Sequence, residues 1–404
     1  MKLSEELVWR GFKAQNTFTD ISELDKGARK FYLGADPSAD SLTIGNLAAL
    51  MMVYCFVRHG YEPFMLVGGA TGQIGDPKDN EERQLKALEE VEYNKGKIAE
   101  QFRRIIRADF TLVDNYDWFK DIGYLEFLRL VGKQFSMTQL LDREFVKARI
   151  GEGKSGVSYA EFSYSLIQGY DFLHLYREYG VDLQLCGADQ YGNCVSGVHL
   201  IKRLGDEGAR ADVWSTPLVI DKVSGRKFGK SEGNAIWLAE EKTSVFDFYQ
   251  FWVGLADEGI DYYMKIYTLL GREELEAVIA EHMKDPSKRV AQKTLAYEVT
   301  KVVHGEEKAE MARKITEVLF GGGDVSELGG AELELLAESL PVVKSGQMVT
   351  DVLVESGEVK SKGEARRLIS GGAIEVNNEK ITDDMELTGV SLVKKGKNKF
   401  VLVR

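Results

Sequence analysis

Strand-like and helix-like segments alternate along the first two-thirds of this chain, and this alternation constrains the fold more than any other feature. The strand-like segments are short apolar runs that begin at Lys30, and helical patterns separate them. Such alternation predicts an α/β fold, a parallel sheet wrapped by helices. In such sheets ligands bind beyond the carboxyl ends of the strands. The expected strands cover 30–34, 64–68, 108–113, 181–187 and 214–221.

The rest of the chain departs from this rhythm, and 404 residues are too many for one ordinary core. A sheet domain over 1–235 is expected, with a helical insertion at 117–160. Periods of three and four then predict a helical domain over 236–320. A glycine-rich segment predicts a flexible linker over 321–345, followed by a small α+β domain over 346–404.

Composition limits the classes of function. Apolar residues make up 44% and charged residues 29%, as in soluble globular proteins, and a net charge of −12 argues against sequence-independent coating of nucleic acid. Cys55, Cys186 and Cys194 lack CxxC spacing, so buried free thiols in a reducing cytoplasm are expected rather than a disulfide framework or a metal site. The polar start shows no secretory signal, and the apolar run 47–57 is too short to span a bilayer.

Two short motifs lie far apart in the sequence. GADPSADSLTIGN at 34–46 reads as a turn that opens a helix, whose first amides attract anions, while Gly45 permits close approach of a nucleotide. A capped helix start with Ser41 or Thr43 as N-cap is the alternative. KFGKS at 227–231 offers two ammonium groups and a hydroxyl for a departing pyrophosphate, although a solvated basic turn would look similar. Together the motifs predict a triphosphate clamp in an enzyme that activates its substrate with a nucleotide.

A third group of polar residues follows helical spacing. Tyr164, Gln168 and Asp171 recur at i, i+4 and i+7, which puts them on one face of a helix. On a half-exposed helix this face would meet solvent, but on a buried helix it must pair with a ligand. Gln168 and Tyr164 could receive an ammonium group, and Asp171 could accept a hydrogen bond from a phenol.

These segments resemble the class I aminoacyl-tRNA synthetases, with TIGN in place of the HIGH motif and KFGKS in place of KMSKS. Within that class the chain is similar to bacterial tyrosyl-tRNA synthetases along nearly its whole length. The resemblance rests on YLGADPSADSL, VGGATGQIGDP, FSYSLIQGYDF, GADQYGN and KFGKS. It implies a Rossmann-like catalytic domain and a tyrosine–tRNA ligase, which forms tyrosyl-adenylate from tyrosine and Mg-ATP and then transfers tyrosine to tRNA(Tyr). It also implies catalysis by positioning and charge stabilisation, without a covalent enzyme intermediate or a tightly bound cofactor.

The resemblance also assigns roles to individual residues. Tyr32 and Asp171 would hold the substrate hydroxyl. The residues implied to bind tyrosine are Tyr32, Asp76, Tyr164, Gln168, Asp171 and Gln190. Those implied to bind ATP are Asp36, Gly45, Gly187, Asp189 and Lys230. Those implied to be catalytic are Ser38, Thr43, Asn46, Lys227, Lys230 and Ser231. For Asp189, capping of the following helix is the alternative. Two departures stand out: Thr43 and Asn46 replace the two histidines of the family motif, and the loop around Arg83 is one residue shorter than in the family.

The last segment resembles a small RNA-binding fold shared with a ribosomal protein of the S-four type. Its basic helical face would carry Lys360, Lys362, Arg366 and Arg367, although a solvated charged helix is the alternative. The family further implies a homodimer that forms through the insertion. A tryptophanyl enzyme, a non-catalytic RNA-binding relative and a generic nucleotidyltransferase are the competing interpretations. The pairing of Tyr32 with Asp171 favours tyrosine.

Overall fold

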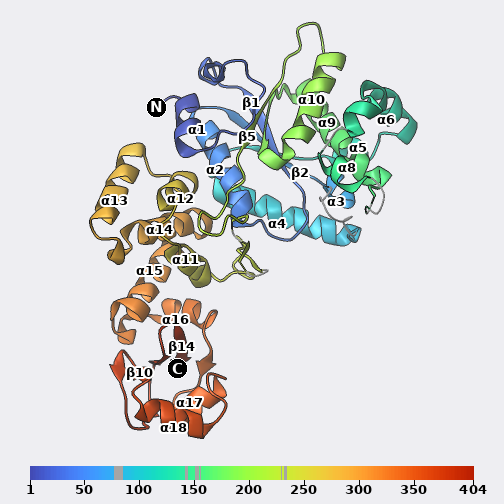
Figure 1. The fold of residues 1–404 in the computed structure, drawn as a ribbon. Coiled ribbons are helices and arrows are strands. Elements are labelled where there is room, and N and C mark those ends of the chain that lie inside the picture. The colour runs from blue at the N-terminus through green and yellow to red at the C-terminus, as the bar shows by residue number, and fades with distance from the viewer. Residues whose placement is uncertain (77–84, 142–143, 151–153, 155, 229, 232–233) are drawn as a thin grey trace. The chain divides into compact units, whose positions relative to one another are not determined.

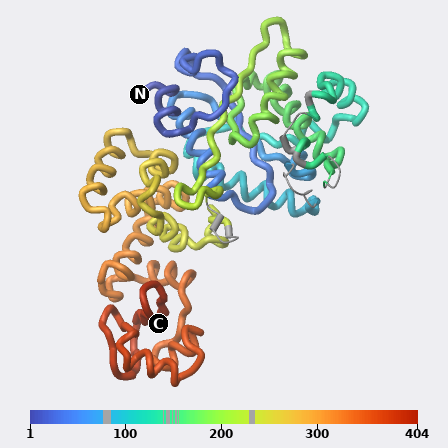
Figure 2. The backbone as a smooth tube through the Cα atoms, viewed as in Figure 1, coloured from blue at the N-terminus to red at the C-terminus, as the bar shows by residue number. Residues whose placement is uncertain are grey.

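The computed structural model describes residues 1–76, 85–141, 144–150, 154, 156–228, 230–231 and 234–404. Contacts divide the chain into two units (Figures 1 and 2). The first contains 1–238 together with 261–270, and the second contains 239–260 together with 271–404. The chain therefore leaves the first unit, returns to it for one short segment, and leaves it again.

A parallel sheet forms the centre of the first unit, as the sequence predicts. Within the described residues it has five strands in the order β3-β2-β1-β4-β5. These strands are β1 (Lys30–Ala35), β2 (Glu62–Val67), β3 (Thr111–Asp114), β4 (Leu183–Gly187) and β5 (Asp212–Thr216). The inner strands are buried along most of their length, which explains why their sequences are continuous apolar runs. The strand order reverses between β1 and β4, so their carboxyl ends mark the switch point where a ligand is expected.

Helices on this sheet position the site. α2 (Ile44–Arg58) is mostly apolar, and its buried residues face the core. α9 (Tyr159–Tyr179) starts with a Ser158–Glu161 capping box and ends at Gly180, whose φ is 71°. α10 packs on β4 and β5, and α2 and α4 pack on β2 (Figure 1). The helices of the first unit outside the insertion are α1 (Leu3–Arg10), α2 (Ile44–Arg58), α3 (Thr71–Ile74), α4 (Leu88–Ile106), α9 (Tyr159–Tyr179), α10 (Tyr191–Leu204) and α12 (Ile260–Tyr267).

Short helices fill the segment between β3 and α9, in agreement with its helical pattern. They are α5 (Tyr116–Phe119), α6 (Tyr124–Leu130), α7 (Met137–Leu141) and α8 (Glu144–Arg149). A buried ion pair ties the end of α8 to α9: Arg149 Nη1 and Nη2 lie 2.7 and 2.9 Å from the two carboxylate oxygens of Glu161. This bidentate pair fixes the insertion to the helix that carries Tyr164.

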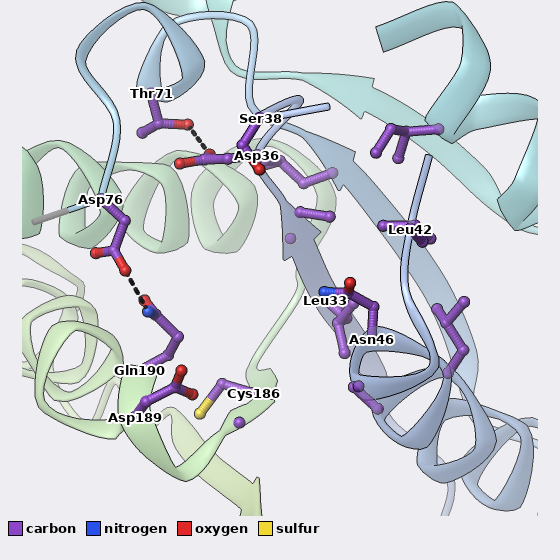
Figure 3. A pocket seen from close by; sticks show the side chains of 18 of the residues that line it. Leu33, Asp36, Ser38, Leu42, Asn46, Thr71, Asp76, Cys186, Asp189 and Gln190 are labelled. Atoms are coloured by element: carbon purple, nitrogen blue, oxygen red, sulfur yellow. Dashed lines mark hydrogen bonds between the residues drawn. The ribbon is translucent and has the colours of Figure 1, made fainter. Parts of the chain in front are cut away.

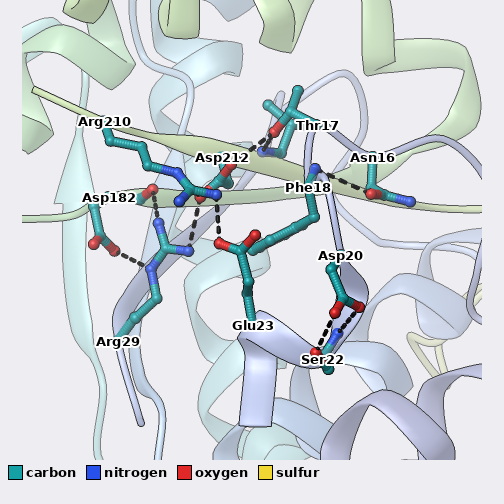
Figure 4. A network of polar contacts seen from close by, with 11 residues as sticks. Asn16, Thr17, Phe18, Asp20, Ser22, Glu23, Arg29, Asp182, Arg210 and Asp212 are labelled. Carbon is teal, nitrogen blue, oxygen red and sulfur yellow. Dashed lines mark hydrogen bonds and ion pairs between the residues drawn. The ribbon is translucent and has the colours of Figure 1, made fainter. Parts of the chain in front are cut away.

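The amino edge of the sheet is held by a separate set of charges (Figure 4). Arg29 lies just before β1, and its Nε and Nη1 lie 2.9 Å from Asp182 and 2.9 Å from Asp212, which precede and begin β4 and β5. Arg210 adds a contact to Glu23 at 2.5 Å. One guanidinium group thus joins the starts of three neighbouring strands.

The second unit begins with helices and ends with a small α+β part. Its helices are α11 (Val245–Val253), α13 (Arg272–Lys284), α14 (Val290–His304), α15 (Glu306–Gly321), α16 (Gly330–Ala337), α17 (Val349–Glu355) and α18 (Lys362–Ser370). Its strands are β8 (Val342–Val343), β9 (Gln347–Met348), β10 (Ile374–Val376), β11 (Glu379–Lys380), β12 (Glu386–Leu387), β13 (Ser391–Lys395) and β14 (Lys399–Val403). Most of these strands form a sheet in the order β11-β10-β13-β14-β8.

The predicted flexible linker at 321–345 needs correction. It contains a 3₁₀ turn at Val325–Glu327, helix α16 and strand β8, which pairs in parallel with β14. The glycines suggested an unstructured joint, but Leu335 and Leu336 are buried and β8 completes the edge of a sheet. Elsewhere, no helix in the described parts of the chain has the length and apolar character needed to cross a membrane.

Candidate active site

A cavity of about 370 Å³ opens in the first unit, where the carboxyl ends of β1 and β4 meet the start of α2 and one face of α9 (Figure 3). Motifs far apart in the sequence therefore share one space. The predicted residues that line it are Tyr32, Asp36, Ser38, Thr43, Gly45, Asn46, Asp76, Tyr164, Gln168, Asp171, Gly187, Asp189, Gln190 and Lys227. Lys230 and Ser231 form strand β6, but their side chains, like the whole of Gly229 and Arg83, lie outside the described residues.

Tyr32 and Asp171 lie at the buried end of the cavity. Each is 2% exposed, and the Tyr32 hydroxyl has no hydrogen-bond partner in the described structure. Burial raises the pKa of the Asp171 carboxyl well above its usual range, although hydrogen bonds from Asn115 and Trp118 oppose this shift. Burial likewise raises the pKa of the Tyr32 phenol. A buried hydroxyl without a partner beside a carboxylate is a place for a ligand that can hydrogen-bond to both.

Two neutral donors orient Asp171. Trp118 Nε1 donates to Oδ1 at 2.9 Å, and Asn115 Nδ2 donates to Oδ2 at 3.2 Å. Neither residue was predicted from the sequence. One signal was available: Asn115 directly follows β3, at the edge of the sheet where functional side chains gather. Trp118 reaches Asp171 only through tertiary contact between the insertion and α9, so no local sequence signal marks it.

The same network continues to the next predicted residues. Asn115 Nδ2 also lies 3.0 Å from Thr71 Oγ1, which donates to Asp36 Oδ1 at 2.6 Å. Tyr164 donates its hydroxyl to Asp36 Oδ2 at 2.6 Å, so its oxygen can still accept a hydrogen bond. Burial, followed by the charge of Asp36, raises the pKa of Tyr164. Asp36, which directly follows β1, is thus held at the cavity wall by hydrogen bonds from Thr71 of α3 and Tyr164 of α9.

A second polar group lies beside it. Gln190 Nε2 donates to Asp76 Oδ2 at 2.7 Å (Figure 3), and Asn193 Nδ2 lies 3.2 Å from Gln190 Oε1. Gln168 Nε2 contacts the Sγ of Cys194 at 3.6 Å, which leaves Gln168 Oε1 buried without a partner in the described structure. Carboxylate and amide oxygens predominate here, which suits a cationic group.

Gln184 is another buried polar residue that the sequence analysis missed. It lies on β4 opposite Tyr32, lines the cavity and is 2% exposed. Its Oε1 has no hydrogen-bond partner among the described residues. A glutamine inside an otherwise apolar strand was the available signal. The cysteines, by contrast, match their prediction, since all three are buried free thiols.

The first motif forms the start of α2. Thr43 is the N-cap residue, and Asn46 Oδ1 accepts hydrogen bonds from its backbone N–H at 3.0 Å and from its hydroxyl at 2.9 Å. Ile44 donates its N–H to the carbonyl of Ile236 at 3.1 Å. The N–H of Ile44 is therefore not among the amides that this helix start can offer to an anion. Ser41 is buried and bonds to Leu42 and Gln101, so it does not cap the helix.

The second motif meets the first through backbone contacts. Lys227 bridges to Ile220, and Phe228 donates its N–H to Val219. A short hairpin follows, in which β6 (Lys230–Ser231) pairs with β7 (Asn234–Ala235). Next, Trp237 bridges to Thr43. The segment that directly follows the basic hairpin is therefore paired with the start of α2.

The glycine and the aspartate after β4 lie at the mouth of the cavity. Asp189 is exposed within the 3₁₀ turn Ala188–Gln190 and does not cap α10. A Cβ atom on Gly187 would come within 2.6 Å of Asp189 Oδ1. Glycine at 187 therefore leaves room for the Asp189 carboxylate at the edge of the site.

The predicted basic face belongs to the second unit. Lys360, Lys362, Arg366 and Arg367 are exposed on or just before α18. Lys362 forms an ion pair with Asp351, so part of its charge is balanced locally. Lys360, Arg366 and Arg367 carry the remaining positive charge of this face.

Comparison with known proteins supports one family over the whole chain. The family described as tRNA synthetases class I (W and Y) matches residues 24–321, and the tyrosine–tRNA ligase SYY-like C-terminal domain matches 332–404. Tyrosine–tRNA ligases from Cytophaga hutchinsonii and Bacillus caldotenax are 42% and 43% identical; the alignments cover 99% and 100% of this chain and 98% and 100% of theirs. A C-terminally truncated mitochondrial tyrosyl-tRNA synthetase from Aspergillus nidulans superposes with a TM-score of 0.70 at 29% identity, over 79% of this chain and 94% of its own. The chain therefore belongs to the tyrosine–tRNA ligase family of class I aminoacyl-tRNA synthetases.

Proposed function

We propose that this chain activates L-tyrosine with Mg-ATP and transfers the tyrosyl group to the terminal adenosine of tRNA(Tyr). One observation carries the choice of amino acid. The unpartnered hydroxyl of Tyr32 and the carboxylate of Asp171 line the same buried end of the cavity. A substrate phenol between them can donate to Asp171 and accept from Tyr32. Phenylalanine would leave both groups unpaired, and the tyrosyl enzyme is the standard example of this kind of rejection.

The other end of tyrosine fits the acidic group of the cavity. The substrate ammonium would donate its hydrogen bonds to Tyr164, Gln168 and Asp76. Tyr164 can accept because its own proton is already donated to Asp36. Gln168 offers an unpartnered oxygen, and Asp76 supplies charge. Gln190, bonded to Asp76, would adjoin the substrate carboxylate.

The first chemical step then requires no nucleophile from the enzyme. A carboxylate oxygen of tyrosine attacks the α-phosphorus of ATP, and the bond to the bridging oxygen breaks to release pyrophosphate. Asp36, Gly45, Gly187 and Asp189 would bind the nucleotide, and Mg²⁺ enters as part of the Mg-ATP substrate. Ser38, Thr43, Asn46, Lys227, Lys230 and Ser231 would stabilise the charge that develops on the phosphates. Thr43 donates a hydrogen bond but carries no charge, so this contact is weaker than that of a histidine.

The second step needs a tRNA, and we assign its docking to the second unit. The exposed Arg366 and Arg367 on α18, beside the turn at Gly371 and Gly372, suit a phosphate backbone. We propose that this α+β part has the S-four type of RNA-binding fold.

We also propose a homodimer formed through the insertion, which exposes the apolar side chains of Tyr124, Leu125 and Met137. The buried free thiols suit a cytoplasmic location.

One experiment tests the proposed function directly. ATP–pyrophosphate exchange is measured with the full chain and each of the twenty amino acids in turn. Tyrosine alone is expected to stimulate exchange, and aminoacylation of tRNA(Tyr) is expected to follow. Exchange stimulated by tryptophan, or by no amino acid, would overturn the proposal.

A further inference from the structure

Two tyrosines of α12 connect the motifs of the site, although α12 follows them in sequence. Tyr263 and Tyr267 are 1% and 0% exposed. The ring of Tyr263 stacks on Phe228 of the second motif, with centroids 4.5 Å apart and planes 18° apart. The Tyr267 ring lies 5.9 Å from the same phenylalanine. Phe228 is the one apolar residue of KFGKS, and it is 3% exposed.

The hydroxyl groups of these tyrosines bond to the backbone of the same two regions. Tyr267 donates to the carbonyl of Ile44, the first residue of α2, at 3.1 Å. Tyr263 accepts a hydrogen bond from the N–H of Lys222 at 2.9 Å, in the turn that follows Ile220, the residue that bridges to Lys227. Ile44 donates its own N–H to Ile236, directly after the β6–β7 hairpin. The N–H of Ile44 therefore binds the segment that follows the hairpin, while its carbonyl binds Tyr267, whose ring lies against Phe228 at the start of the basic segment.

α12 is itself firmly attached to the first unit. Arg10 donates to the carbonyl of Lys265 at 2.9 Å, to that of Thr268 at 2.9 Å and to that of Leu270 at 2.8 Å, which satisfies carbonyl groups where the helix ends. Glu6 fixes Arg10 through an ion pair of 2.9 Å. The tyrosines thus project from an element whose position is set independently of the hairpin.

We propose that Tyr263 and Tyr267 are positioning residues for phosphate chemistry, which hold Phe228 and thereby set the hairpin that carries Lys230 against the start of α2. The inference rests on the proposed function, because the hairpin matters only if it serves pyrophosphate release. Neither tyrosine touches the substrate. Their effect is expected on the activation step, while tyrosine binding, which uses the far end of the cavity, is unchanged.

Tyr267→Phe is the main test, and Tyr61→Phe is its matched control. Tyr61 is also buried and also donates its hydroxyl to a backbone carbonyl, that of Leu24 at 2.8 Å, away from the site. Both variants lose one such bond, so similar falls in thermal midpoint are expected. Only Tyr267→Phe is expected to lower the maximal rate of tyrosine-dependent pyrophosphate exchange, by about fivefold. The dissociation constant for tyrosine, measured by equilibrium dialysis, should match that of the parent.

A double-mutant cycle tests the stack itself. Tyr263→Leu and Phe228→Leu are each expected to lower the exchange rate by between about threefold and tenfold, and the double variant should be little worse than either single variant. Multiplicative effects, or identical kinetics for Tyr267→Phe and Tyr61→Phe, would overturn the inference while leaving the proposed function intact. A parent chain without tyrosine-dependent exchange would overturn both.

Discussion

The two edges of the parallel sheet bury carboxylates to the same degree but give them different partners. At the amino edge Asp212 is 2% exposed and pairs with Arg29 at 2.9 Å. At the cavity beyond the carboxyl edge Asp171 is also 2% exposed, yet its hydrogen bonds come from the neutral groups of Asn115 and Trp118. A carboxyl group that is paired with a cation within the chain, such as Asp212, stabilises the fold. A carboxyl group held only by neutral donors, such as Asp171, can still bind a ligand.

Replacing Asp171 with asparagine should give the largest effect. The amide NH₂ would face donors from Asn115 or Trp118, and one buried donor would lose its acceptor. A buried donor left without its acceptor costs about 1–3 kcal/mol, so kcat/KM for tyrosine in pyrophosphate exchange should fall by up to roughly 150-fold. Thermal unfolding should change little. If the variant unfolded more readily but still activated tyrosine normally, Asp171 would have a structural role like that of Asp212, and the proposed difference between the two edges would be wrong.

The matching change at the amino edge, Asp212→Asn, should show the reverse pattern. It removes a charged acceptor from Arg29, which keeps Asp182 as a partner. Urea denaturation should show a loss of about 1–3 kcal/mol in the free energy of unfolding. Exchange per folded molecule should equal that of the parent. A large fall in kcat/KM for tyrosine would mean that this edge also serves the site.

Trp118→Phe sharpens the comparison by removing one donor while leaving Asp171 in place. The ring can still stack near His174, whose centroid lies 4.4 Å from that of the indole. Loss of the 2.9 Å hydrogen bond should raise KM for tyrosine about tenfold. Discrimination against phenylalanine should fall in parallel, as competition assays would show. Unchanged discrimination would indicate that Asp171 needs no help from the insertion.

Thr43→Ala should give the smallest of these effects, at the exposed end of the same cavity. It removes the hydroxyl that contacts Asn46, and loss of an N-cap costs about 1 kcal/mol. The rate of activation should fall about fivefold while the dissociation constant for tyrosine stays constant. Thr43→Ser retains the hydroxyl and serves as the control. Equal activation rates for Thr43→Ala and the parent would count against any role for Thr43.

The sequence predicted the elements better than the contacts between them. The apolar runs that form the strands are local signals, so all five predicted strands are present. Only β1 starts where it was predicted, at Lys30; the other starts differ by two or three residues, as at β3, which starts at Thr111 rather than 108. The polar spacing on α9 likewise located Tyr164 and Asp171. The donors to Asp171 were not predictable, because Asn115 and Trp118 reach it only through tertiary packing.

Glycine content misled the prediction over 321–345. Gly321 to Gly323 do end α15, but Leu335 and Leu336 downstream have a core to enter, and β8 has a neighbouring strand to pair with. Glycine content indicates how flexible a segment is by itself, but it does not indicate whether the segment has a core or a neighbouring strand to pack against. Thr43 is the N-cap residue of α2, as the alternative interpretation predicted. It also lines the cavity, so the two interpretations are compatible.

The return of residues 261–270 to the first unit bears on how this enzyme can be divided. A recombinant piece ending at Leu238 would keep every cavity-lining residue but would lack the carbonyls that Arg10 binds and the rings that cover Phe228. Such a piece is expected to expose new apolar surface and to aggregate. Limited proteolysis between 239 and 260, by contrast, should leave the cut ends held together by packing.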